Sequence, residues 1–186
     1  KGEKFVLAFE EAFGVTFGNS RDKDGVTSIA LMAEAAAYCK ANGKTLLELI
    51  DEMYINIGYY SELGVEKYYQ GADGKTRMVE IMKRLRTDPP ADIGGLKVSE
   101  IRDVQSGKII RDGKETGTID LPAQNLLFFI LEDNSWIAVR PSGTEPKIKS
   151  YIGVIEKTDK DHYVETARKK GKLLNLLKSE ALKLLE

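Results

Sequence analysis

Hydrophobic residues between positions 1 and 60 form one short apolar run, followed by two stretches with helical spacing. Phe5–Phe9 is continuous and apolar, which is typical of a buried strand. Apolar residues then recur every three or four positions over 24–41, so we expect a helix that ends at Asn42-Gly43. A capping-box pattern at Thr45–Glu48 predicts a second helix to about residue 56. The inward residues expected for the two helices are Ile29, Ala33, Ala36 and Ala37, then Leu46, Leu49, Ile50 and Met53.

Helical spacing breaks around Gly58–Gly64, and we place a domain boundary near residue 60. Beyond it, a helix is predicted over Lys75–Leu85, and a last helix opens at a second capping-box pattern, Thr158–Asp161. Their expected inward residues are Met78, Ile81, Met82 and Leu85, then Leu173, Leu177, Ala181 and Leu184. Short strands are expected at Val65–Tyr69, Leu96–Val104, Lys108–Arg111, Asn125–Leu131, Ser135–Arg140 and Lys147–Ile155.

Composition and charge narrow the classes of partner. The 186 residues carry a net charge of −1, so no basic excess favours nucleic acid or an anionic membrane surface. No apolar run approaches the roughly 20 residues of a membrane span. Cys39 is the single cysteine, which excludes an intrachain disulfide and fits a reducing cytoplasm. The chain opens at Lys1 without a methionine, and we expect it to be part of a longer protein.

The segment Arg140–Lys147, between two expected strands, concentrates groups that bind a phosphate monoester. Arg140 offers a planar fork of donors, and Ser142 and Thr144 offer hydroxyls. Gly143 lets a backbone N–H approach an oxygen, and Lys149 follows on the same face of the next strand as Lys147. On residue types alone, a tight polar turn with solvated charges remains an equal alternative.

Two charged segments come earlier in the chain. Arg21–Gly25 reads RDKDG at a helix start, where Lys23 between two aspartates could exchange a proton with a hydroxyl if desolvated. A charged helix cap is the plainer interpretation. Glu10 and Glu11 follow the first apolar run and are placed to bind sugar hydroxyls, although many such pairs are simply solvated.

Together these segments resemble the alpha-D-phosphohexomutases, the phosphoglucomutase/phosphomannomutase family. RPSGTEP at Arg140–Pro146 is similar to that family's phosphate-binding loop in its fourth domain. Phe9–Gly14 resembles the sugar-binding loop of domain three, and Arg21–Gly25 resembles the segment whose lysine is implicated in proton transfer. Order and spacing agree, so the resemblance covers essentially the whole chain.

The resemblance implies an α+β fold in two parts. Residues 1–60 would be the end of an α/β/α domain three, and residues 61–186 a small antiparallel sheet with helices, domain four, similar to the TATA-binding protein. It implies a proton-transfer role for Lys23 and sugar contacts from Glu10 and Glu11. The phosphate contacts that it implies are Arg140, Ser142, Gly143, Thr144 and Lys149.

Two positions depart from the family pattern. Ala12 stands where many members have serine. The branch that acts on glucose- and pentose-phosphates can carry alanine there, and this chain looks most like that branch. Lys149 stands where some members have arginine, so it would contact phosphate as a point charge rather than a fork.

The family mechanism transfers a phosphoryl group through a phosphoserine and a sugar bisphosphate intermediate, assisted by Mg²⁺ held in an aspartate-rich loop. Neither the phosphoserine loop nor the metal loop occurs in these residues. The resemblance therefore assigns both to N-terminal domains of the same protein. The expected partner is a phosphorylated sugar, no metal site is expected in this chain, and the chain alone should not catalyse.

Three other functions compete with this hypothesis. A stand-alone module that binds phosphorylated ligands would need the same loop without catalysis. A curved antiparallel sheet could bind nucleic acid, against the near-neutral charge. Gly71–Thr76 is similar to a nucleotide phosphate loop, but Tyr69 stands where that motif needs its first glycine.

Overall fold

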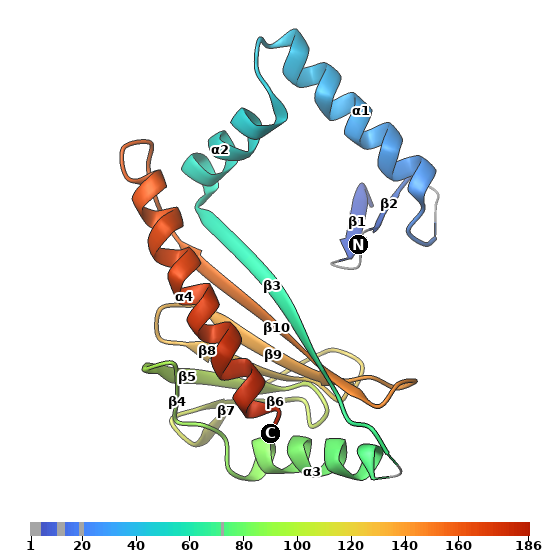
Figure 1. Ribbon diagram of the computed structural model, residues 1–186, viewed down its shortest axis with the longest axis vertical. Coiled ribbons are helices and arrows are strands. Elements are labelled where there is room, and N and C mark those ends of the chain that lie inside the picture. The colour runs from blue at the N-terminus through green and yellow to red at the C-terminus, as the bar shows by residue number, and fades with distance from the viewer. Residues whose placement is uncertain (1–4, 11–13, 19–20, 72) are drawn as a thin grey trace. The chain divides into compact units, whose positions relative to one another are not determined.

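The computed structural model describes residues 5–10, 14–18, 21–71 and 73–186, with only the backbone of Glu10. Within these ranges the chain divides into two compact units, Lys1–Met53 and Tyr54–Glu186. Figure 1 labels their helices and strands. Each unit is described by itself.

The first unit contains a hairpin and a long helix. β1 (Leu7–Glu10) pairs antiparallel with β2 (Gly14–Phe17), and α1 (Gly25–Ala41) follows. The expected strand and both helices are present, whereas β2 was not expected. The predicted inward stripe of α1 is wrong: Ile29 and the three alanines are exposed, and Cys39 is its buried residue. The helix is apolar on several sides, so spacing alone did not fix its inner face.

Local capping explains where the first two helices begin. The Asp24 carboxylate accepts hydrogen bonds from the backbone N–H groups of Val26 (2.8 Å) and Thr27 (3.3 Å) at the start of α1. Before α2 (Leu46–Ile57), Thr45 Oγ1 accepts from Glu48 N at 3.2 Å and Glu48 accepts from Thr45 N at 2.7 Å. This reciprocal pair confirms the predicted capping box.

The second unit is an antiparallel sheet with helices on one face. The strands lie in the order β3-β10-β9-β8-β5-β6-β7, and β4 pairs with β5. Helix α4 packs along β3 and β10 (Figure 1). The bounds are β3 Tyr59–Tyr68, α3 Gly74–Thr87, β4 Asp92–Ile93, β5 Leu96–Asp103, β6 Lys108–Arg111, β7 Lys114–Thr118, β8 Leu127–Leu131, β9 Trp136–Pro141, β10 Lys147–Glu156 and α4 Tyr163–Leu184.

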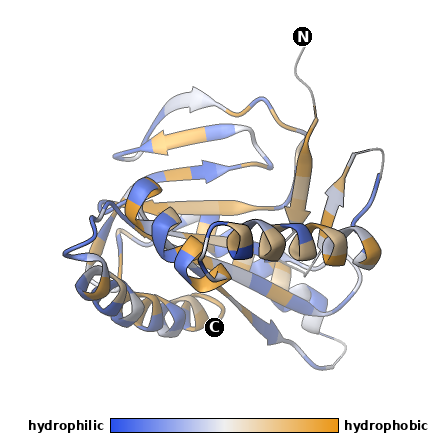
Figure 2. Ribbon diagram, turned by 90° about the horizontal axis from the view of Figure 1, so that it is seen from above, coloured by the Kyte–Doolittle hydropathy of each residue, from blue (hydrophilic) through white to orange (hydrophobic). Residues whose placement is uncertain are grey.

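The hydrophobic core lies between the helices and one face of this sheet. All four residues expected inward on α3 are buried there. On α4 the inner face is turned by one residue at each end, because Leu174 and Leu185 are buried while Leu173 and Leu184 pack at its margin. In Figure 2 the helices carry hydrophilic and hydrophobic residues side by side, as packing on one face requires.

The opposite face of the sheet follows from strand alternation. Ile148, Ser150 and Ile152 of β10 are fully buried on the core side, so Lys147, Lys149 and Tyr151 belong to the other side. The register places Lys149 between Glu66 of β3 and Arg140 of β9. The outer face of three adjacent strands therefore carries a charged row, whereas α3 and α4 bury their apolar side chains on the core side of the sheet.

Three local predictions differ from the structure. β3 begins at Tyr59 rather than at the expected Val65, because a ten-residue ladder with β10 outweighs the low strand propensity of Gly64. Thr158 does not cap α4. Instead Asp159 Oδ1 accepts from the backbone N–H groups of Asp161 and His162, both at 3.0 Å. The short strands β4 and β7 were not expected.

Candidate functional site

The segment between β9 and β10 is a closed loop held by its own backbone. Ser142 N donates to Lys147 O at 2.8 Å, and Lys147 N donates to Glu145 O at 2.8 Å. Tyr69 N, at the end of β3, donates to Pro146 O at 2.8 Å. The loop is thereby tied to two neighbouring strands, so its shape does not depend on a ligand to order it.

The Ser142 hydroxyl organises the interior of the loop. Ser142 Oγ accepts from Thr144 N at 3.3 Å and from Glu145 N at 3.2 Å. A hydroxyl has two lone pairs and one O–H donor, so these two bonds leave only the O–H, which can donate to Thr144 Oγ1 or to an acceptor outside the loop. Thr144 Oγ1 lies 3.5 Å from Ser142 Oγ, which puts both hydroxyls on one side of the loop.

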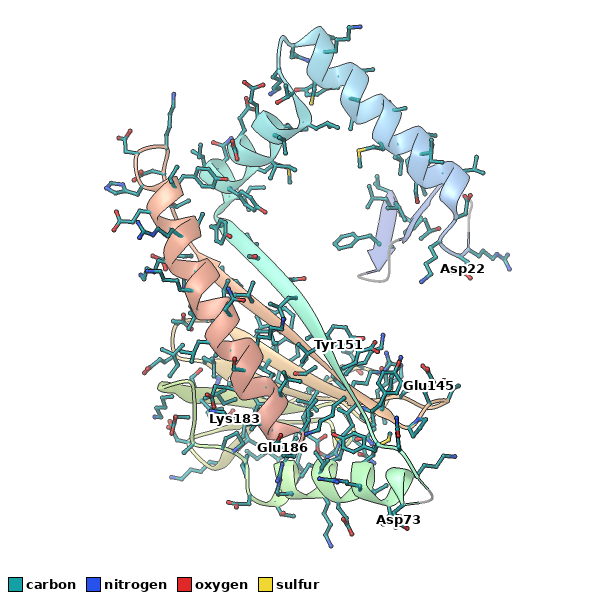
Figure 3. The ribbon with its side chains drawn as sticks, viewed as in Figure 1. Asp22, Asp73, Glu145, Tyr151, Lys183 and Glu186 are labelled. Atoms are coloured by element: carbon teal, nitrogen blue, oxygen red, sulfur yellow. The ribbon has the colours of Figure 1, made fainter. Side chains whose placement is uncertain are left out.

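These groups line one pocket of about 440 Å³. Figure 3 shows Glu145 in the loop and Tyr151 further along the adjoining strand. All five residues expected to bind phosphate lie around this pocket, namely Arg140, Ser142, Gly143, Thr144 and Lys149. The remaining lining residues are Pro141, Glu145, Lys147 and Tyr151. The structure therefore brings the expected residues together, and their role as phosphate ligands stays a prediction.

The Lys147 ammonium, buried beneath the loop, is fully occupied. The side chain is 10% exposed, and Nζ lies 3.0 Å from Glu66 Oε2, 2.9 Å from Glu145 Oε2 and 3.0 Å from Tyr68 OH. The hydrogen bond to Tyr68, followed by those to the two carboxylates, raises the pKa of Lys147 above its ordinary value. An ammonium has three N–H donors, so these partners use them all. Lys147 fixes the loop to β3 rather than facing a ligand.

Lys149 has a different environment on the same strand. It is half-buried and lines the pocket, and Nζ lies 3.1 Å from Glu66 Oε1. That hydrogen bond with Glu66 raises the pKa of Lys149, so it is a cation at neutral pH. Among the described residues, Glu66 is the single hydrogen-bonding partner of Lys149 Nζ, so two N–H donors of the ammonium remain for the pocket.

The contacts and backbone conformation of the described residues do not by themselves require an arginine at position 140 or a glycine at position 143. Arg140 is exposed, and it forms no ion pair with any residue in the described ranges. A Cβ added to Gly143 would meet no atom within 4 Å, and the residue does not have a positive φ. Neither backbone conformation nor crowding within this chain therefore requires glycine, whereas a ligand that approaches the backbone would.

The segment around Lys23 forms a second, smaller pocket of about 140 Å³ in the first unit. Lys23 lies against Gly14, because a Cβ there would come within 2.4 Å of Lys23 Cδ. The other residues that line this pocket are Ala8, Phe9, Thr16, Arg21 and Asp22. The lysine and the end of the β1–β2 hairpin are thus neighbours. Glu11, Ala12 and the side chain of Glu10 lie outside the described residues.

Sequence reasoning missed Glu66, Glu145 and Tyr151. Glu66 could not be found because the register of β3 against β10 is a long-range property. Within the described ranges, no group of three or more His, Cys, Asp or Glu side chains could hold a metal ion, and no helix is long and apolar enough to cross a membrane.

Comparison with known families agrees with this architecture. The description "Phosphoglucomutase/phosphomannomutase, alpha/beta/alpha domain III" matches residues 1–56, and "Phosphoglucomutase/phosphomannomutase, C-terminal domain" matches residues 82–169. The chain therefore contains two consecutive domains of one protein class, and it has the α+β fold that was expected. The chain belongs to the phosphoglucomutase/phosphomannomutase family and corresponds to the C-terminal part of its members.

Individual relatives give the extent of the match. The chain is 36% identical over 154 residues to a phosphoglucomutase of Staphylococcus aureus, and 33% identical over 153 residues to that of another strain. It spans 28% of the length of these relatives. The crystal structure of the open form of pp63/parafusin, a phosphoglucomutase from Paramecium, shares the fold with a TM-score of 0.53 and 19% identity, over 95% of this chain and 30% of that one.

Proposed function

We propose that this chain is the substrate-phosphate and sugar-binding part of a phosphosugar mutase. The complete enzyme would interconvert a sugar 1-phosphate with its 6-phosphate, or with its 5-phosphate for a pentose. The reaction would pass through a phosphoserine and a sugar bisphosphate, with the phosphoserine in preceding domains of the same protein. The observation that carries this proposal is the pocket formed by Arg140, Ser142, Thr144 and Lys149.

The donors of this pocket match what a phosphate group requires. A phosphate dianion has only acceptors, and the loop presents the Arg140 fork, two hydroxyls on one side and the Lys149 ammonium. The loop is already closed by backbone hydrogen bonds, so little conformational entropy is lost on binding. Charge-assisted bonds of this kind contribute about 1.5–3 kcal/mol each.

The phosphate held here would be the one that is not being transferred. In phosphoryl transfer the protein contributes mainly by positioning and charge stabilisation. A firm hold on the remote phosphate orients the sugar, so its binding energy lowers the barrier as well as the Michaelis constant. After one transfer the bisphosphate turns around, and its other phosphate would take the same place.

The first unit would contribute the sugar contacts and a proton-transfer group. Glu10, the last residue of β1, and Glu11, the next residue in the sequence, would accept hydrogen bonds from sugar hydroxyls. Lys23, on the loop before α1 and against the β1–β2 hairpin, would take or return the proton of the attacking hydroxyl. When bound in the preceding domains, Mg²⁺ would neutralise charge on the transferred phosphoryl group.

Substitution of Arg140 in the complete protein tests the proposal. Arg140→Ala removes one charge-assisted contact, so the Michaelis constant for a sugar phosphate should rise about 10–150-fold. Arg140→Lys should recover only part of the loss, because a point charge cannot replace the fork. Arg168, exposed on α4, provides the control substitution. An unchanged Michaelis constant for Arg140→Ala, across a panel of hexose and pentose phosphates, would remove the basis of the proposal.

A further inference from the structure

A row of three charged residues crosses the outer face of the sheet beside the loop. The register pairs Lys149 with Glu66 on one side and with Arg140 on the other. Directly opposed residues on antiparallel strands have Cβ atoms about 4.5–5.5 Å apart. Two cations, Lys149 and Arg140, are therefore immediate neighbours, and like charges in this position repel.

Glu66 is shared between the two lysines of β10. Its Oε1 lies 3.1 Å from Lys149 Nζ, and its Oε2 lies 3.0 Å from Lys147 Nζ. Tyr68 OH donates to the same Oε2 at 3.2 Å. The hydrogen bonds from Lys147 and Lys149 hold the pKa of Glu66 below its ordinary value, so the carboxylate is ionised at neutral pH.

The contact with Glu66 has a different consequence for each of the two lysines. Lys147 has no donor left after its three partners, and it ties the loop residue Glu145 to β3. Lys149 donates one hydrogen bond to Glu66 and lines the pocket. A free lysine side chain carries about 2 kcal/mol of rotamer entropy, which binding would otherwise have to overcome. The ion pair removes part of that freedom before the ligand arrives.

We propose that Glu66 is a positioning residue for phosphate binding, which holds the Lys149 ammonium at the edge of the Arg140–Thr144 pocket. This proposal rests on the proposed function. Glu66 does not line the pocket, so it acts through Lys149 and does not contact the phosphate. It also supplies the counter-charge that lets Lys149 and Arg140 stand side by side when no anion is bound.

A double-mutant cycle in the complete enzyme tests this inference. Glu66→Gln removes the charge at nearly constant shape, and the Michaelis constant for a sugar phosphate should rise about 2–5-fold, the size of a half-exposed ion pair's contribution. Lys149→Met should raise it further. In the Lys149→Met background, Glu66→Gln should have a smaller effect than in the original protein, because only the contact of Glu66 with Lys147 is then left to lose. Turnover should change less than the Michaelis constant in each variant.

Glu62 provides the matched control. It lies on the same strand and the same face as Glu66, is exposed and stands opposite Gly153 rather than a lysine. Glu62→Gln should leave the Michaelis constant unchanged. Thermal unfolding of each variant separates a loss of fold from a loss of positioning.

Each outcome bears on one of the two proposals. A lower Michaelis constant for Glu66→Gln would mean that the carboxylate only repels phosphate, and it would overturn the inference. Equal effects of Glu66→Gln with and without Lys149 would overturn it too. If Arg140→Ala raises the Michaelis constant while Glu66→Gln does nothing, the inference fails alone. If Arg140→Ala also does nothing, the phosphate site itself is wrong.

Discussion

Lys170 of α4 offers a test of how the helix is held on the sheet. Its side chain is 4% exposed, and Nζ lies 2.9 Å from Asp133 Oδ2 and 3.2 Å from Glu156 Oε2. Asp133 lies in the turn between β8 and β9, and Glu156 ends β10. Lys170→Met keeps most of the apolar stem but leaves both carboxylates without their buried cation.

The expected loss of unfolding free energy depends on how deeply Lys170, Asp133 and Glu156 are buried. Breaking a fully buried ion pair by removing one partner costs about 3–5 kcal/mol. The carboxylate side chains here are 26% and 31% exposed, so water reaches them and reduces the penalty. We therefore expect Lys170→Met to lower the free energy of unfolding of the second unit by about 2–4 kcal/mol. Lys169→Met is the control. That side chain is 68% exposed beside Glu156, so its loss should be about 0–1 kcal/mol.

The ion pair between Lys170 and Asp133 predicts that the stability of the second unit depends on pH. Burial raises the pKa of Asp133, but hydrogen bonds from Lys170 and Ser135 outweigh it and hold the pKa below its ordinary value. A lowered folded-state pKa contributes stability above the unfolded value of about 3.9, and this stability is lost as the pH falls through the folded value. The difference in unfolding free energy between the original chain and Lys170→Met should have its full size at pH 7 and should shrink below about pH 4.

Urea unfolding followed by tryptophan fluorescence measures this difference. Trp136 on β9 is the single tryptophan of the chain, so its signal reports the second unit. A loss for Lys170→Met no larger than that for Lys169→Met would refute the reasoning, as would a difference that stays constant down to pH 2.

Two further predictions concern packing and catalysis. Gly153→Ala should destabilise the second unit by about 1–3 kcal/mol and alter the fluorescence of Trp136, because a Cβ there would lie 2.3 Å from the indole ring, and urea unfolding measures the loss. Gly171→Ser on α4 should change that fluorescence little, because a Cβ added there would meet no atom within 4 Å. In the complete enzyme, Lys23→Met should lower turnover about 10²–10⁴-fold with a smaller change in the Michaelis constant, as steady-state kinetics would show. Near-normal turnover would return Lys23 to the role of a charged residue beside a helix cap.

Features that depend on neighbouring residues could be predicted from the sequence. The Thr45–Glu48 capping box is confirmed because both of its hydrogen bonds join residues three apart. The buried face of α3 is confirmed because its apolar residues, apart from the exposed Val79, follow a single helical stripe with charged residues between them. The loop at Arg140–Lys147 could be located because its residue types are distinctive and strands flank it.

Features set by distant segments could not be predicted. Glu66 meets Lys149 only through the register of β3 on β10, and a shift by one residue would have turned it to the core. The start of β3 at Tyr59, rather than at the expected Val65, has the same cause, since the long ladder with β10 decides the extent of the strand. On α1, the apolar residues surround the helix, so the sequence left the buried side open.

The central claim is that the Arg140–Thr144 pocket holds the phosphate that is not being transferred. A crystal structure of the complete protein with a bound sugar phosphate tests it most directly. The account predicts one phosphate group with oxygens about 2.7–3.2 Å from the Arg140 guanidinium, the Ser142 and Thr144 hydroxyls and Lys149 Nζ. A sugar phosphate bound in the active centre with both its ends away from this loop, and with Arg140 in solvent, would contradict it.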